Sequence, residues 1–162
     1  MITIIHKDLF ESDANILIHQ VNTEGVMGAG IARTVKAKYP KVFEKYHKVC
    51  KSYSVDDLLG KVQLLDTGDG RKICNLFAES LNRKIEGNRR TNYDAFRRAF
   101  LSLLDKVAPN TKLAMPYLIG CGLGGGDWKV IYYIIEKCLE QHKDKNLEVE
   151  ICSLDPLPFY MK

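Results

Sequence analysis

The sequence lacks the features that mark membrane proteins, disulfide-rich proteins and repeat proteins. No apolar run approaches the roughly 18 residues that a transmembrane helix requires, so we expect no membrane partner. The five cysteines are irregularly spaced and include no CxxC pair, which argues against a disulfide framework and a metal site. The N-terminus has no signal-peptide pattern, and there is no repeat or linker. We therefore expect a cytoplasmic, monomeric chain that folds as one domain over residues 1–162.

The chain carries little excess charge of either sign. Its net charge of +4 favours an anionic ligand, but it is far below the basic field of a dedicated nucleic-acid binder. The densest basic stretch is Arg83-Lys84 and Arg89-Arg90, opposed by Glu86. A solvated loop and a phosphate contact explain this stretch equally well, so both interpretations remain open.

Short apolar runs alternate with amphipathic helical stretches along the chain. We expect strands at 2–5 and 15–19, helices at 31–39 and 42–53, and a hairpin of 61–65 with 72–77. A helix capped by Thr91, a strand at 111–115, a helix capped by Asp127 and a strand at 146–153 should follow. This pattern predicts a three-layer α/β/α sandwich with a mixed, largely parallel central sheet.

Two glycine-rich loops each follow an expected buried strand and precede a helix. The first spans 19–30, and the second has five glycines among the seven residues 120–126. Glycine permits close approach of backbone N–H groups to an anion, and a helix N-terminus adds its dipole. A tight turn without a ligand would explain either loop alone. Because both follow strands of one sheet, they should face each other and hold a ligand with several phosphates, or a phosphate and a sugar.

The two loops together resemble those of a known family. Met27-Gly-Ala-Gly-Ile-Ala32, paired with Gly120-Cys-Gly-Leu-Gly-Gly-Gly126, is similar to the macro domain, and the likeness spans almost the whole chain. The segments 19–22, 75–79 and 90–93 resemble the branch that contains ADP-ribose 1''-phosphate phosphatases and related ADP-ribose hydrolases. Lys7-Asp8-Leu9 fits the family's Gly-Asp-Ile step, with lysine in place of glycine.

The resemblance implies that the ligand is ADP-ribose or a derivative, with no cofactor. It implies that Asp8 accepts a hydrogen bond from the adenine amino group, that the Leu9 backbone reads the ring, and that Asn22 contacts the distal ribose. Leu154, or Asp155, Phe159 or Tyr160, would lie near adenine. The diphosphate and distal ribose would be held by two sets of residues: Gly28, Ala29, Gly30 and Ile31 from the first loop, and Gly122, Leu123, Gly124, Gly125 and Gly126 from the second.

Three positions depart from the family pattern. Leu154 stands where many relatives have an aromatic residue that stacks on adenine. Gly124 stands where relatives that cleave ADP-ribose esters through a lysine have an aspartate, and the next acid here is Asp127. Glu79 stands where relatives often have glutamine, and it adds a negative charge near the cleft.

The catalytic candidates are few. His19, at the end of a strand, is expected to act as an acid, a base or a phosphate contact, unless it is a core histidine. Asn22 and Asp127 are expected to converge with it on the distal ribose, unless Asp127 serves as a helix cap alone. Lys84 would have to attack ribose C1'' directly. Cys121 would be a nucleophile if its pKa were lowered.

These residues leave three functions open. The first, which we expect, is ADP-ribose binding with removal of phosphate from ADP-ribose 1''-phosphate, with His19 and Asp127 assisting water. The second is hydrolysis of O-acetyl-ADP-ribose or of an ADP-ribosylated macromolecule, either protein or nucleic acid. The third is a binding module that recognises ADP-ribose without turning it over.

Overall fold

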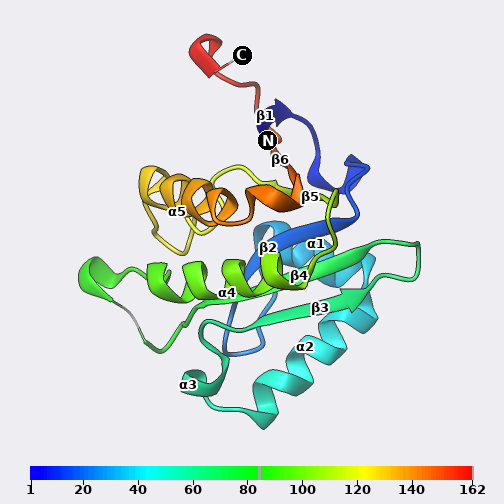
Figure 1. Cartoon of the computed structure of the whole chain (residues 1–162). Coiled ribbons are helices and arrows are strands. Elements are labelled where there is room, and N and C mark those ends of the chain that lie inside the picture. Colours follow the sequence, from blue (N-terminus) through cyan, green and yellow to red (C-terminus); the bar gives the residue numbers. More distant parts are fainter. Residues whose placement is uncertain (84, 162) are drawn as a thin grey trace.

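The computed structural model describes residues 1–83 and 85–161, which form a six-stranded sheet between two layers of helices (Figure 1). The strand order is β1-β6-β5-β2-β4-β3. The pairing of β3 with β4 is antiparallel, and the other pairings are parallel. The expected mixed, largely parallel sheet and its hairpin are therefore confirmed. The strands are β1 (Ile2–His6), β2 (Ile16–Asn22), β3 (Val62–Asp66), β4 (Lys72–Glu79), β5 (Lys112–Pro116) and β6 (Glu148–Ser153).

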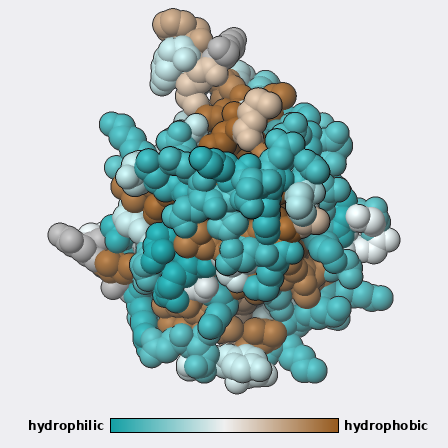
Figure 2. Space-filling view, in the orientation of Figure 1, coloured by the Kyte–Doolittle hydropathy of each residue, from teal (hydrophilic) through white to brown (hydrophobic). Residues whose placement is uncertain are grey.

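The helices divide between the two faces of the sheet. One face is covered by α1 (Gly30–Lys38) and α2 (Pro40–Ser52), and the other by α4 (Tyr93–Lys106) and α5 (Trp128–Glu140). The short α3 (Val55–Leu58) leads from α2 towards β3. Figure 2 shows that the outer surface over α4 and α5 is mainly hydrophilic. No helix among the described residues is long and apolar enough to cross a bilayer.

The central strand β2 supplies side chains to both hydrophobic cores. Ile16 and Ile18 pack into the core beneath α4 and α5, whereas Leu17 and Val21 pack into the core beneath α1 and α2. A strand buried on both faces reads as a continuous apolar run. This arrangement confirms the interpretation of the run at 16–18.

Two local expectations need correction. The strand expected at 15–19 continues to Asn22, because its parallel pairing with β4 extends to Asn22 opposite Glu79 across a bulge. Thr91 is not the cap of α4. The cap is Asn92, whose side chain accepts a hydrogen bond from Ala95 N at 2.9 Å. Thr91 is instead buried, and its hydroxyl donates to the carbonyl of Gly120 at 2.7 Å.

The sheet opens between the carboxyl ends of β2 and β5. These strands pair through 16–17 against 113–114, whereas β2 remains paired with β4 as far as its end. The strand order also reverses here. The strands that come after β2 in the chain, β3 and β4, lie on one side of this point, and β6, which comes after β5, lies on the other. Open α/β sheets bind their ligands at such switch points.

Candidate functional site

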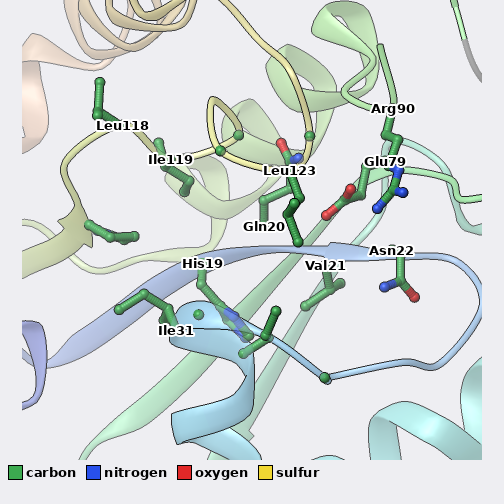
Figure 3. A pocket seen from close by; sticks show the side chains of 18 of the residues that line it. His19, Gln20, Val21, Asn22, Ile31, Glu79, Arg90, Leu118, Ile119 and Leu123 are labelled. Atoms are coloured by element: carbon green, nitrogen blue, oxygen red, sulfur yellow. The ribbon is translucent and has the colours of Figure 1, made fainter. Parts of the chain in front are cut away.

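A cavity of about 580 Å³ lies where β2 and β5 diverge, and it is bounded by both glycine loops (Figure 3). This volume falls within the range of small-molecule sites. The first loop contributes Gly28, Ala29, Gly30 and Ile31, and the second contributes Gly122, Leu123 and Gly124. The two loops therefore lie at the same end of the sheet and face each other, as the sequence predicts.

Unpaired backbone N–H groups from both loops border this cavity. Within the described part of the chain, the N–H groups of residues 28–32 and 122–124 have no hydrogen-bond acceptor. Residues 30–32 form the first turn of α1, where N–H groups have no partner within the helix and the macrodipole favours negative charge. The two loops together make a cradle for an anionic group such as a diphosphate.

The first loop is shaped by the side chain of Asn22. Its carbonyl oxygen accepts from the backbone N–H groups of Glu24 and Val26, both at 3.1 Å, and from the buried Tyr46 hydroxyl at 2.7 Å. Its amide nitrogen donates to the Val26 carbonyl at 2.8 Å. One amide hydrogen is left for a ligand. Asn22 lies in the cavity wall, and its established contacts hold the loop in place.

The second loop is fastened through Thr91 and Gly124. The backbone N–H groups of Arg90 and Thr91 both donate to the Gly124 carbonyl at 3.0 Å, and the Gln20 amide donates to Thr91 Oγ1 at 2.9 Å. A Cβ atom at residue 124 would lie 2.8 Å from the Gly120 carbonyl oxygen and closer still to Thr91 Oγ1. The loop therefore has no room for the aspartate that some relatives carry here.

His19 is a buried, neutral imidazole in the wall of the cavity. Burial lowers its pKa to about 4, and its Nε2 lies 2.6 Å from Asn75 Oδ1. Because the Asn75 amide donates to Gln63 Oε1 at 3.0 Å, this assignment makes Asn75 Oδ1 an acceptor and places the proton on Nε2. Nδ1 is then an acceptor, and it is buried without a partner in the described structure. It has almost no accessible surface, so a ligand or water molecule reaches it only if the cavity wall moves.

One end of the cavity carries opposite charges. Glu79 ends β4 beside Asn22, and the side chains of Glu79 and Arg90 extend towards the same space (Figure 3). Burial raises the pKa of Glu79, while a hydrogen bond from Gln20 and the charge of Arg90 oppose the rise. This end can therefore stabilise charge on a group bound next to Asn22.

The structure does not bring Asp127, Gly125 or Gly126 into the cavity wall. The Asp127 carboxylate caps α5 by accepting from Lys129 N at 2.9 Å, so its expected convergence with the other catalytic candidates is not found. The Gly125 and Gly126 N–H groups donate to carbonyls within the second loop, at 3.0 and 2.9 Å. In this conformation these groups hold the loop in shape and are not available to a phosphate.

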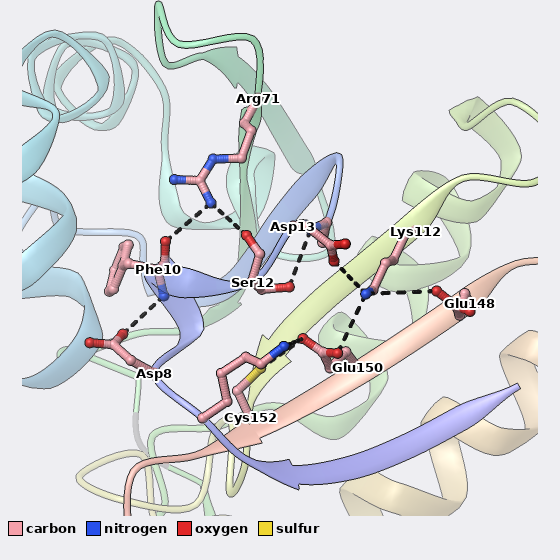
Figure 4. A network of polar contacts seen from close by, with 11 residues as sticks. Asp8, Phe10, Ser12, Asp13, Arg71, Lys112, Glu148, Glu150 and Cys152 are labelled. Atoms are coloured by element: carbon pink, nitrogen blue, oxygen red, sulfur yellow. Dashed lines mark hydrogen bonds and ion pairs between the residues drawn. The ribbon is translucent and has the colours of Figure 1, made fainter.

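The residues assigned to adenine also lie outside the cavity wall. Asp8 Oδ1 accepts from Phe10 N at 2.9 Å, at the edge of the polar network in Figure 4. Leu9 is buried in the core beneath α1, and Leu154 is 64% exposed. Their contacts with adenine remain predictions.

The two remaining catalytic candidates are Cys121 and Lys84. Burial raises the pKa of Cys121 to about 11, so its thiol stays protonated near neutral pH and is a poor nucleophile. Lys84 lies outside the described residues. Gln20 and Arg90 are both in the cavity wall as well. The sequence predicts no role for Gln20, although it lies within the first glycine-rich loop, and it leaves a phosphate contact open for Arg90.

Known proteins match this chain over most of its length. The family described as Macro domain matches residues 18–135. The DNA ADP-ribosyl glycohydrolase of Mycobacterium tuberculosis is 32% identical over 148 residues, which cover 89% of this chain and 40% of that protein. This chain thus spans about two fifths of the length of that relative.

A second relative and a solved structure agree with this match. The ADP-ribose 1''-phosphate phosphatase of Saccharomyces cerevisiae is 30% identical over 153 residues, which cover 78% of this chain and 85% of that protein. The macrodomain of Mycobacterium tuberculosis DarG has a TM-score of 0.76 and 26% identity, and the match covers 96% of this chain and 99% of that one. The chain belongs to the macro domain family.

Proposed function

We propose that this chain binds ADP-ribose across its two glycine loops and hydrolyses the bond between the distal ribose and a modified nucleic acid. The observation that carries the binding step is the pair of facing loops with unpaired N–H groups. Backbone N–H groups of this kind can bind a diphosphate without a metal ion, because their fixed dipoles replace the water molecules that hydrate the phosphates. Relatives named for activity on ADP-ribosyl DNA and on ADP-ribose 1''-phosphate support ADP-ribose as the ligand.

The charge of Glu79 favours cleavage of a glycosidic bond over cleavage of a phosphate ester. When a glycosidic bond breaks, positive charge develops at the anomeric carbon, and a nearby carboxylate stabilises it. A phosphate on the same carbon would instead be repelled by that carboxylate. Glu79 lies beside Asn22, the residue expected at the distal ribose. The negative charge is therefore better suited to a nucleic-acid adduct than to a 1''-phosphate.

The reaction balances with water as the co-reactant. The bond from ribose C1'' to the nucleic acid breaks, and the water oxygen bonds to C1''. One water proton passes to the departing atom, which leaves free ADP-ribose and an unmodified nucleic acid. Neutral His19 would hold the cavity wall beside the water and would not supply a proton.

Phosphate release from ADP-ribose 1''-phosphate is the second candidate function, and the yeast relative favours it. The test compares an oligonucleotide carrying one ADP-ribosylated base with ADP-ribose 1''-phosphate at equal concentration. We expect ADP-ribose release at least about tenfold faster than phosphate release. The opposite order would overturn the proposal in favour of the phosphatase. Binding of ADP-ribose without either reaction would leave a binding module.

Two variants examine the chemical step. Glu79→Gln should slow release of ADP-ribose at least about tenfold, the scale of a lost charged catalytic group, with little change in the affinity for ADP-ribose. Lys84→Ala examines attack by lysine at C1'', which rests on the sequence alone. If Lys84→Ala abolishes turnover while Glu79→Gln is unaffected, the stabilising role of Glu79 is wrong.

A further inference from the structure

A second cavity of about 320 Å³ adjoins the first at the end where Arg90 lies. The two cavities share Arg90, which lines both. The second is formed by α3, by the chain after β4 and by α4, and its wall includes Arg83 and Arg98 as well as Arg90. We call these three residues and the cavity they border the arginine groove.

The arginine groove has a net positive wall. Its three guanidinium groups face one carboxylate among the described wall residues, that of Asp56. Arg83 pairs with Asp56 through two contacts, and both side chains are more than half exposed, so the pair is weak and easily exchanged. A guanidinium has five N–H donors, so Arg83 keeps several for another acceptor.

The other two arginines are placed differently. Arg98 donates to the Leu59 carbonyl at 3.3 Å and to Asp94 at 2.8 Å, and its guanidinium packs on Gly60. These contacts hold its position before any ligand binds. The Arg90 guanidinium makes no hydrogen bond to the described residues, although the charge of Glu79 acts on it.

The remaining described arginine of the basic stretch, Arg89, is used internally. Arg89 donates to the Thr91 carbonyl at 2.9 Å, and its guanidinium carbon lies 4.0 Å from the centre of the Tyr93 ring. Among the described residues of the basic stretch, Arg89 is therefore structural, whereas Arg83 and Arg90 open onto the groove.

We propose that the arginine groove binds the phosphodiester backbone next to the modified base of a nucleic-acid substrate. The inference rests on the proposed function: a base attached to C1'' leaves the first cavity at the Arg90 end, where its strand meets the groove. Guanidinium groups bind phosphates in two-point contacts, and most protein contacts to nucleic acid are made to phosphates. The groove sets the position of the strand, whereas the first cavity recognises ADP-ribose.

The test uses two neighbouring arginines of α4. Arg97 and Arg98 both pair with Asp94 at 2.8 Å, but Arg98 borders the groove and Arg97 does not. Arg98→Gln should lower kcat/KM for an ADP-ribosylated oligonucleotide roughly fivefold, the scale of one charge-assisted phosphate contact. It should reduce the salt dependence of binding by about one phosphate. Arg97→Gln should leave both near wild type.

An ADP-ribosylated mononucleoside provides the second comparison, because it has no flanking phosphates. Arg98→Gln and Arg83→Gln should leave its hydrolysis and the affinity for free ADP-ribose unchanged. The proposal that the arginine groove binds phosphate would be wrong if Arg98→Gln slowed hydrolysis of the mononucleoside and the oligonucleotide equally. It would also be wrong if the Arg97 and Arg98 variants behaved alike. An ADP-ribosylated acidic peptide that is preferred over the oligonucleotide and depends on Arg98 would overturn it as well.

Failure of the proposed function is separable from failure of the groove. Binding of an unmodified oligonucleotide, followed by fluorescence anisotropy at low salt, requires no catalysis. If Arg98→Gln weakens this binding and Arg97→Gln does not, phosphate binding by the arginine groove is supported even when no adduct is hydrolysed. If the two variants bind the oligonucleotide equally, the groove fails even when hydrolysis is observed.

Discussion

Acidification should destabilise this protein through one buried side chain, that of His19. Burial lowers the pKa of His19 from 6.5 to about 4, because a charged imidazolium in the cavity wall would lose its hydration. As the pH falls below 6.5, the unfolded chain binds a proton at His19 that the folded chain does not. The stability contributed by neutral His19 is therefore complete above about pH 6.5 and is lost as the pH falls towards 4.

The size of this effect follows from the two pKa values. One pKa unit corresponds to about 1.4 kcal/mol, so acidification from pH 7 to pH 4 should remove about 3 kcal/mol through His19. Urea unfolding, followed by tryptophan fluorescence at several pH values, measures the free energy of unfolding. The buried carboxylates also respond to acid, so the comparison between variants is the informative quantity.

Two histidine variants isolate the contribution. His19→Gln cannot titrate, so it should lose about 3 kcal/mol of the difference between pH 7 and pH 4 that the wild type shows. His142→Gln should not reduce that difference and should slightly enlarge it, because the hydrogen bond to Asp105 raises the pKa of His142, and a raised pKa adds stability as the pH falls. If the wild type and His19→Gln lose equal stability as the pH falls, the conclusion that His19 is a buried, neutral imidazole is wrong.

Three further predictions concern the loops, the ion pairs and adenine. Gly124→Ala should lower the melting temperature clearly, because its Cβ would press against backbone, whereas Gly122→Ala, with nothing within 4 Å, should not. Equal melting temperatures would contradict the packing of the second loop. Lys112→Met should lower the free energy of unfolding by roughly 1–3 kcal/mol, because Lys112 pairs with the Glu150 carboxylate, which is only 10% exposed. Lys72→Met should lower it by under about 1 kcal/mol, because Lys72 and Asp66 form an exposed pair. The reverse order would contradict the network in Figure 4. ADP-ribose should bind at about −8 kcal/mol, the micromolar range, and Asp8→Ala should weaken this by roughly 1–3 kcal/mol in calorimetry. Equal wild-type affinities for ADP-ribose and ribose 5-phosphate would contradict the adenine assignment.

The sequence predicts the layered sheet because hydrophobic periodicity reports burial directly. A strand buried on both faces, such as β2, and the long apolar stripe of α4 leave patterns that need no knowledge of their partners. The residues at which helices and strands begin and end were harder to predict. Thr91 and Asn92 are both good helix caps, and the choice depends on the Gly120 carbonyl, which is distant in sequence and accepts from Thr91.

The site was predictable where it depends on local backbone chemistry. Glycine density located both loops, and the unpaired N–H groups of the first loop follow from its position at the start of α1. The sequence predicts the cap role of Asp127, which the structure confirms, but it could not exclude a ligand contact, because a capping carboxylate and a ligand-binding carboxylate occupy the same position in sequence. The neutral state of His19 depends on burial and on Asn75, so it emerges from the assembled sheet.

The central claim is that the cavity binds an ADP-ribosylated nucleic acid and cleaves it at the distal ribose. The most direct measurement is the intact mass of an ADP-ribosylated single-stranded oligonucleotide before and after incubation with an equimolar amount of the purified protein. The account predicts complete conversion to the unmodified oligonucleotide, with free ADP-ribose as the other product. An unchanged oligonucleotide mass, in a sample that binds ADP-ribose, would contradict it.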